Sequence, residues 1–457
     1  MNDALHRDLS EIDEVLNAAA DLAQRYLAGI NERPAGLLPT THPLLDLPEH
    51  AAGGRAAIET FAARYYDELT ASAGPRSFGY VVGGATPAAV AGDWLTAAFD
   101  QDNGEGMTAQ LETEAMHMLR QLFRLPDDHT GVFVSGATMA NVVGLATARE
   151  WLGQQRGVHI AQDGVAALEP VRILSSRPHS SIYKAAAMLG LGRSAIVEVP
   201  CLLETESIDP DALEQFFQEH AGQPCIVVGN AGTVNATSFD DFEALVRLRK
   251  KHHFWLHVDG AFGLFAACSP QYDALVEGVG AADSIAVDAH KWLNVPYDCG
   301  VVFTRYPDLQ REVFVNANAP YLRDSSDVID YMNRTPEASR RLRALPVWTT
   351  LMAYGRAGYQ EIVERDCAAA QSLAARIEAS DVFRLLTPCT FNVVCFTLCD
   401  DPERVNAVLD KLTADGTAFL TPTTYRGVLG IRAAFCNWRT TETDVAQTWE
   451  ALIRCAA

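Results

Sequence analysis

The chain has 457 residues, of which 48% are hydrophobic, and a formal net charge of −22 at pH 7. A chain of this length exceeds one simple core, so we expect two or three lobes. The negative charge argues against nucleic acids and anionic membranes as partners, and no apolar run is long enough to span a bilayer.

The first expected elements along the chain are helices. The N-terminal helix is amphipathic, with Leu9, Ile12, Val15 and Leu16 at helical spacing, and it has neither the basic start nor the apolar block of a signal peptide. The ten cysteines form no CxxC pair and no zinc-type group with histidine. We therefore expect reduced thiols, no metal site and a cytoplasmic protein.

From about residue 105 onward, helical stretches alternate with short apolar strands. The strands are expected at "GVFVSG", "VRILSS", "AIVEVP", "PCIVVGNAG", "FWLHVDG" and "DSIAVDAH". This alternation predicts a mostly parallel sheet with helices on both faces. After about residue 346 the pattern changes and predicts a small α+β domain. We expect a helical segment over 1–80, a large domain over 81–345 and the small domain over 346–457.

Ligand sites in such sheets gather at the C-terminal ends of the strands. The segment Ser135-Gly136-Ala137-Thr138 follows the first strand and opens a helix. Small residues and hydroxyls at a helix N-terminus can cradle an anion, although a simple N-cap explains them as well. A nucleotide P-loop is excluded because no Gly-Lys-Ser/Thr follows. His179 and Thr233 also follow strands, where turn chemistry alone could account for them.

Asp259 and Lys291 end two further strands. A carboxylate at the end of a buried strand is costly unless it is paired, so Asp259 is either a helix cap or the partner of a cation. Lys291 stands between His290 and Trp292. A solvated turn is its ordinary explanation, whereas in a partly dry pocket it becomes an amine nucleophile. An anion cradle, a ring partner, a carboxylate and a lysine together are what pyridoxal 5′-phosphate (PLP) requires.

Several blocks of the chain resemble the PLP-dependent amino-acid decarboxylases of the group that includes aromatic-L-amino-acid, glutamate and tyrosine decarboxylases. The blocks are "GVFVSGATMANVVGL", "PHSSIYKAAAMLG", "GNAGTVNATSFDD", "WLHVDGAFG", "DSIAVDAHKWLNVPYDCG" and "APYLRD". The short form "DAHKWLNVPYDCG" looks like the bacterial branch. The resemblance implies fold type I of the PLP-dependent transferases, which is like that of aspartate aminotransferase. It also implies PLP as cofactor and a homodimer with shared active sites, in which residues 1–80 serve dimerisation.

The resemblance also implies a role for individual residues. Lys291 attaches the cofactor, Asp259 pairs with its pyridine nitrogen, and Tyr321, thirty residues after Lys291, donates a proton. The other cofactor-binding positions it implies are His179 and Ala261 on the two ring faces, Ala137 and Thr138 at the phosphate, and Thr233, Asp288 and His290 nearby. Two residues depart from the family pattern. Val234 replaces a threonine, and Asp288 replaces an asparagine, which would set a carboxylate near a phosphate unless it is paired or turned towards backbone donors.

The expected reaction is decarboxylation of an L-amino acid to an amine and CO2. Phe78, Tyr80 and Tyr297 could line an apolar pocket for an aromatic substrate, although core packing explains each nearly as well. The resemblance places Arg432 near the substrate carboxylate or the closed loop. Glutamate, aspartate or 2,4-diaminobutyrate as substrate, transamination and aldehyde synthesis stay open. A non-catalytic PLP-binding protein is a further alternative, against which the intact lysine, aspartate and tyrosine argue.

Overall fold

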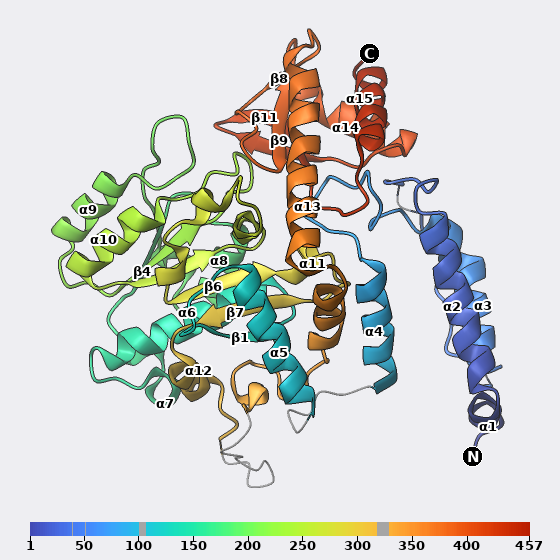
Figure 1. The fold of residues 1–457 in the computed structure, drawn as a ribbon, viewed down its shortest axis with the longest axis horizontal. Helices are drawn as coiled ribbons and strands as arrows, with labels where there is room; N and C mark the ends of the chain where they lie inside the picture. The colour runs from blue at the N-terminus through green and yellow to red at the C-terminus, as the bar shows by residue number, and fades with distance from the viewer. Residues whose placement is uncertain (39, 51, 100–106, 318–328) are drawn as a thin grey trace.

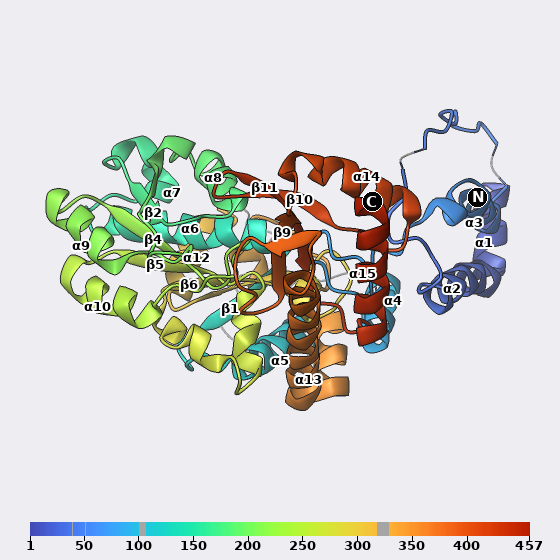
Figure 2. The ribbon, with the colours of Figure 1, turned by 90° about the horizontal axis from the view of Figure 1, so that it is seen from above.

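The computed structural model describes residues 1–457 except 39, 51, 100–106 and 318–328. The chain begins with three helices that lie to one side of the molecule in both views (Figures 1 and 2). These are α1 (Asp3–Ser10), α2 (Ile12–Ala28) and α3 (Gly54–Tyr65), and none of them has a buried residue. Helices α4 (Pro87–Phe99) and α5 (Met107–Leu122) follow and lead into the large domain.

The centre of the large domain is a seven-stranded sheet with the order β1-β7-β6-β5-β4-β2-β3. Its strands are β1 (Thr130–Val134), β2 (Arg172–Ser175), β3 (Ile196–Glu198), β4 (Cys225–Asn230), β5 (Trp255–Asp259), β6 (Ser284–Asp288) and β7 (Gly300–Thr304). Strand β7 runs antiparallel to both of its neighbours, β1 and β6, and the other pairs are parallel. The prediction of a mostly parallel sheet is confirmed, and β7 is a strand that the sequence reading missed.

Helices cover both faces of this sheet. The helices that follow its strands in the chain are α6 (Ala137–Gln154), α7 (Ile160–Asp163), α8 (Ser180–Met188), α9 (Pro210–Glu219), α10 (Phe242–His252), α11 (Ala289–Trp292) and α12 (Pro307–Phe314). Strand β4 shows why both faces are apolar. Ile226 and Val228 belong to one core cluster and Cys225 and Val227 to another, because successive side chains point to opposite faces.

Helix α6 starts directly after β1 and packs against β5, β6 and β7. Its side chains are mostly small, which allows this close approach. A Cβ atom added at Gly144 would lie 2.6 Å from Cε1 of His257 on β5, so only glycine fits there without movement. The N-terminus of α6 is thereby held at the C-terminal ends of the parallel strands.

The small domain contains an antiparallel sheet with the order β10-β11-β9-β8. Its elements are β8 (Phe383–Leu385), β9 (Val393–Leu398), α14 (Val405–Asp415), β10 (Thr421–Tyr425), β11 (Val428–Ala434) and α15 (Glu442–Ala456). The long helix α13 (Ala344–Glu378) joins the two domains and is interrupted at Gly355, where φ is 57° and ψ is −168°. In the part of the chain that the structure describes, no helix is long and apolar enough to cross a membrane.

Candidate active site

A cavity of about 330 Å³ opens at the C-terminal ends of the parallel strands. The strand ends and the first turns of the following helices supply its walls, as expected for an α/β sheet. Ten of the residues singled out from the sequence line it: Ala137, Thr138, His179, Thr233, Asp259, Ala261, Asp288, His290, Lys291 and Tyr297. Residues separated by up to 160 positions in the chain therefore meet in one small space.

Lys291 follows β6 on the short helix α11 and reaches into the cavity. Its Nζ lies 3.2 Å from Oδ2 of Asp288 and 5.8 Å from the ring centroid of Phe262. The lysine side chain is 19% exposed, so it is shielded but can still be reached from solution. This is the setting in which a lysine can act as a nucleophile.

Asp288 is paired on all sides. Its Oδ1 accepts the backbone N–H of Ala137 at 2.6 Å, and its Oδ2 lies 3.4 Å from Nε2 of His290 as well as beside Lys291. A carboxylate at a helix N-terminus is stabilised by the free N–H groups and the helix dipole. The side chain is turned towards a backbone donor, which is one of the two arrangements that make a carboxylate tolerable at this position.

His290 lies between Asp288 and the ring of Tyr297, with 4.2 Å between the ring centroids. Its Nδ1 accepts the N–H of Cys299 at 3.3 Å, which leaves Nε2 facing Asp288. Burial lowers the pKa of His290, and Asp288 opposes that shift only in part. Burial also raises the pKa of the Tyr297 hydroxyl to about 12, so this phenol stays protonated.

Asp259 ends β5 and points into the cavity with 8% of its surface exposed. Oδ1 accepts the N–H of Ala261 at 3.2 Å, and Oδ2 accepts the side-chain amide of Asn141 at 3.1 Å. The carboxylate therefore has two donors, neither of which is a cation. A cationic partner can still approach it from the cavity.

His179 is the N-cap residue of α8. Its Nδ1 accepts from the N–H of Ser181 at 3.2 Å and lies 2.7 Å from the Ser181 hydroxyl. Desolvation is the main cause that lowers the pKa of His179, which favours the neutral form of the ring although part of its surface is open to solvent. A neutral ring on the cavity wall is suited to lie against another flat ring.

The residues of the cavity fit PLP. The cofactor needs an anion site, a nucleophilic amine, a carboxylate for its ring nitrogen and flat or small neighbours for its ring faces. The first turn of α6 with Thr138 offers the anion site, Lys291 the amine and Asp259 the carboxylate. His179 and Ala261 are the ring-face candidates.

Phe78 and Arg432 do not line this cavity, and Thr233 lines it with its hydroxyl bonded elsewhere. Phe78 is 1% exposed and packs in the core of the small domain, 4.4 Å from the ring of Phe435, so it does not line the cavity. Thr233 lines the cavity, but its hydroxyl donates to Glu206. Arg432 is buried behind the wall, where its Nε donates to the carbonyl of Val234 at 2.7 Å. Tyr321 lies outside the described residues.

A second cavity of about 520 Å³ adjoins the first through His290 and Tyr297. Tyr80 lines it, with 62% of its surface exposed and its ring 5.9 Å from that of Phe419. Among its described lining residues there is no lysine or arginine. This second cavity is the place where Tyr80 and Tyr297 come together.

The sequence reading missed the polar residues behind the cavity wall. Asn141 and His257 are fully buried and bonded to each other. Asn141 donates directly to Asp259 and is linked to His179 through Ser181. A signal for them existed. Asn141 interrupts the small and apolar stretch "ATMANVVGLATA", and His257 interrupts the buried strand "FWLHVDG", and buried polar residues in such settings need a partner.

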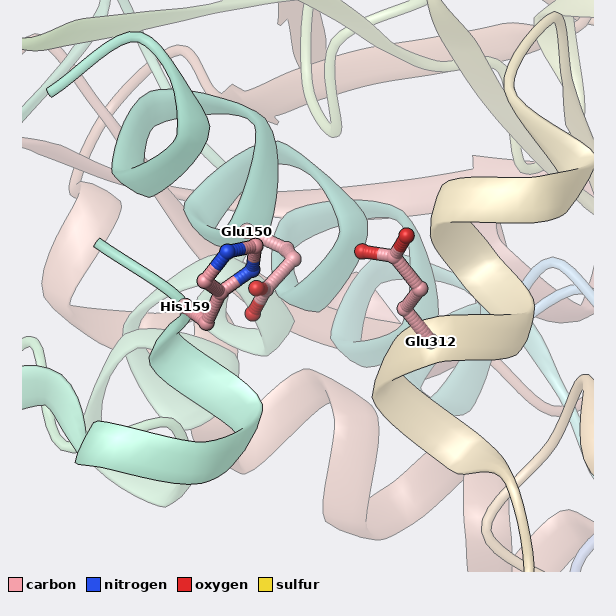
Figure 3. A group of neighbouring side chains, drawn as sticks. All are labelled: Glu150, His159 and Glu312. Carbon is pink, nitrogen blue, oxygen red and sulfur yellow. The ribbon is translucent and has the colours of Figure 1, made fainter. Parts of the chain in front are cut away.

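One further group of possible metal ligands occurs among the described residues, at the junction of α6, α7 and α12 (Figure 3). The ligand atoms of Glu150, His159 and Glu312 lie within 4.8 Å of one another. Glu150 already accepts the N–H of Ala161 and Glu312 the amide of Gln154, each at 2.9 Å. His159 and Glu312 are exposed, and we assign no function to this group.

The fold and the cavity define a PLP-dependent enzyme of fold type I. The model of the family described as "Pyridoxal-dependent decarboxylase conserved domain" matches residues 46–399. The chain therefore belongs to the pyridoxal-dependent decarboxylase family. Its cofactor is PLP and its reaction class is amino-acid decarboxylation, as the sequence predicted.

Similar proteins cover nearly the whole chain. An aromatic-L-amino-acid decarboxylase of Bacillus atrophaeus is 26% identical over 98% of this chain and 96% of its own. A 4-hydroxyphenylacetaldehyde synthase of Rhodiola rosea is 24% identical over 97% of this chain and 95% of its own. Among solved structures, Oryza sativa TDC with PLP and tryptamine superimposes with a TM-score of 0.89, 24% identity and 98% coverage of both chains. That structural likeness shows the shared fold.

Proposed function

We propose that the enzyme decarboxylates an aromatic L-amino acid to the corresponding amine and CO2. The observation that carries the choice of substrate is the second cavity, which has Tyr80, Tyr297 and Phe419 in its wall and no lysine or arginine among its described lining residues. A substrate with an acidic side chain would bury a carboxylate there without a cation, which is unfavourable. An aromatic side chain buries apolar surface instead. The relative from Bacillus atrophaeus, named for aromatic amino acids, supports the same choice.

When bound, PLP supplies an aldehyde for the substrate amine and an electron-poor ring that accepts the electron pair left by departing CO2. We assign the amine that holds the cofactor, and takes it back after the reaction, to Lys291. Asp259 faces the cavity with a carboxylate that can keep a ring nitrogen positive. His179 and Ala261, which both line the cavity, would hold the ring between them. Tyr321 is assigned the return of a proton to Cα, on the strength of the family resemblance.

Arg432 is the proposed partner of a carboxylate, either of the substrate or of the closed loop. The residue is 7% exposed, and among the described residues its guanidinium bonds to two backbone carbonyls and to no acidic side chain. Burial lowers its pKa to about 10, which still leaves it charged at neutral pH. A buried guanidinium without a counter-ion can bind an anionic ligand by charge and by donated hydrogen bonds.

A homodimer is part of the proposal. Helices α1 and α2 expose Leu5, Leu9, Ile12 and Leu16, each by more than half of its surface. An apolar cavity of about 590 Å³ lies between α2, α3 and α4. Exposed apolar surface of this kind is typical of an interface. Light scattering should give twice the chain mass of 49.7 kDa, and a stable monomer would contradict this part.

The test of the proposed substrate is a panel of L-amino acids assayed for CO2 and for the amine product. Aromatic amino acids should be turned over with equal amounts of both products. Lys291→Ala is the matched control and should release neither. Turnover of glutamate, aspartate or 2,4-diaminobutyrate in preference to aromatic amino acids would overturn the choice of substrate. Release of aldehyde in place of amine would favour the aldehyde-synthase chemistry named for the Rhodiola rosea relative.

A further inference from the structure

A continuous row of hydrogen-bonded polar side chains runs behind the cavity from the buried Trp255 to His179, which lies in the cavity wall. Trp255 Nε1 lies 3.0 Å from Ser284 Oγ, which lies 2.7 Å from His257 Nδ1, and His257 Nε2 lies 2.8 Å from Asn141 Oδ1. The Asn141 amide nitrogen then lies 3.1 Å from Asp259 Oδ2 and 3.0 Å from Ser181 Oγ. Ser181 Oγ completes the row at 2.7 Å from His179 Nδ1.

The Asp259 carboxylate, which branches from this row, and the Trp255 indole at one end determine the direction of every hydrogen bond in it. A carboxylate only accepts, so the Asn141 NH2 group faces Asp259 and the amide oxygen faces His257. His257 Nε2 must then donate. Burial lowers the pKa of His257 to about 4, so the ring is neutral and its Nδ1 accepts from Ser284. Ser284 in turn accepts from Trp255, whose indole N–H can only donate.

The same direction continues to the cavity. Asn141 has two N–H bonds, and one goes to Asp259 while the other goes to the Ser181 hydroxyl oxygen. Ser181 therefore gives its own proton to His179 Nδ1, which also accepts the Ser181 backbone N–H. A neutral His179 must consequently carry its proton on Nε2. Asp259 receives only donors and remains an acceptor for the ring nitrogen.

We propose that Asn141 is a positioning residue that sets the hydrogen-bonding states of Asp259 and His179 together. Its amide is the branch point from which one donor goes to each of them, and His257 holds the amide in the required orientation. The proposal rests on the roles proposed above for Asp259 and His179. It does not depend on which amino acid is the substrate.

The decisive variant is Asn141→Asp, which has nearly the same shape but presents an oxygen where the amide donates to Asp259. Two carboxylate groups then face each other, so one proton is shared between them and Asp259 no longer holds the ring nitrogen positive. We expect kcat to fall by roughly 10–100-fold, as when an outer partner of a reacting group is lost, with a smaller change in KM. The matched control is Thr147→Val on the same helix, because the Thr147 hydroxyl is buried but donates only to the carbonyl of Val143.

The readout is 15N NMR of enzyme loaded with PLP labelled at the pyridine nitrogen. The wild type and Thr147→Val should show a protonated ring nitrogen throughout the neutral pH range, whereas Asn141→Asp should show an unprotonated or titrating nitrogen. A folded, loaded Asn141→Asp enzyme with the wild-type signal and pH response would overturn the proposal. If Asn141→Asp does not fold, His257→Leu and His257→Gln replace it, because glutamine can still donate to Asn141 and leucine cannot. The same nitrogen signal in both of these variants would also overturn it.

Asp259→Asn tests the assigned role of Asp259 at the ring nitrogen separately from the positioning role of Asn141. If Asp259 faces the ring nitrogen, this variant loses the protonated signal. An unchanged signal in Asp259→Asn would show that the assigned role of Asp259 is wrong. A changed signal in Asp259→Asn together with an unchanged one in Asn141→Asp would show that only the positioning role is wrong.

Discussion

Replacing Asp288 by asparagine should tighten the binding of the cofactor. Asp288 places a negative charge on the N-terminus of α6, where its Oδ1 accepts the N–H of Ala137 at 2.6 Å. The same helix end is the anion site proposed for the phosphate of PLP. Two anions must therefore share one set of donors, and asparagine keeps the shape of the side chain while removing its charge.

The size of the effect follows from simple electrostatics. If the two anions lie about one helical turn apart, roughly 5 Å, their repulsion at an effective dielectric constant near 20 is about 3 kcal/mol. Lys291 and His290 lie 3.2 and 3.4 Å from Asp288 and offset part of this repulsion. We expect a net gain of about 1–2 kcal/mol, which corresponds to a roughly 5–30-fold lower Kd.

The assay is a fluorescence titration of cofactor-free enzyme with PLP and, separately, with inorganic phosphate. Inorganic phosphate cannot react with Lys291, so it isolates the contribution of the anion site. Asp127→Asn removes the same charge from a side chain that is 99% exposed and serves as the control. Unchanged or weaker phosphate binding in Asp288→Asn would show that Asp288 does not repel an anion at this site and that it supports the helix end instead.

Three further predictions concern stability, pH and product. Arg340→Met should lower the free energy of unfolding, measured in urea, by roughly 3–5 kcal/mol. The reason is that it removes the cation bonded at 2.8 Å to Glu112, whose side chain is 2% exposed. A loss below about 1 kcal/mol, the size of a surface pair, would contradict this. Burial lowers the pKa of His257 from 6.5 to about 4, so the folded state resists a proton that the unfolded state accepts, and stability falls as the pH drops through this range. By pH 5 the free energy of unfolding of the wild type should fall by about 2 kcal/mol. His257→Gln cannot titrate and should not show this loss. Equal pH dependence of the two proteins would argue against a buried neutral ring. Tyr321→Phe should retain PLP but divert product from amine towards aldehyde, and an unchanged amine yield would remove Tyr321 from the mechanism.

The sequence was sufficient for the class of fold and for the residues at the strand ends. Parallel strands deliver their C-terminal ends to one edge, so residues such as Asp259 and Lys291 could be placed together from strand periodicity alone. The antiparallel strand β7 was missed because it follows an irregular turn, and only the four-residue helix α11 lies between it and β6. The pattern of alternating strands and helices does not predict such a strand.

The contacts behind the cavity could not be predicted in the same way. The link from Asn141 to Asp259 joins residues 118 positions apart and depends on how closely α6 approaches β5. Gly144 allows this approach because it has no side chain to contact His257, and that contact is visible only in the folded structure. Phe78 and Tyr80 are only two residues apart, yet one lies in the core of the small domain and the other is 62% exposed at the second cavity. Their aromatic character alone could not separate packing from substrate contact.

The most direct test of the proposed reaction is to treat PLP-loaded enzyme with an aromatic L-amino acid and to measure CO2 and amine in the same sample. We expect equal molar amounts of both products from the wild type and neither product from Lys291→Ala. Wild-type enzyme that carries PLP but releases no CO2 from any L-amino acid would contradict it.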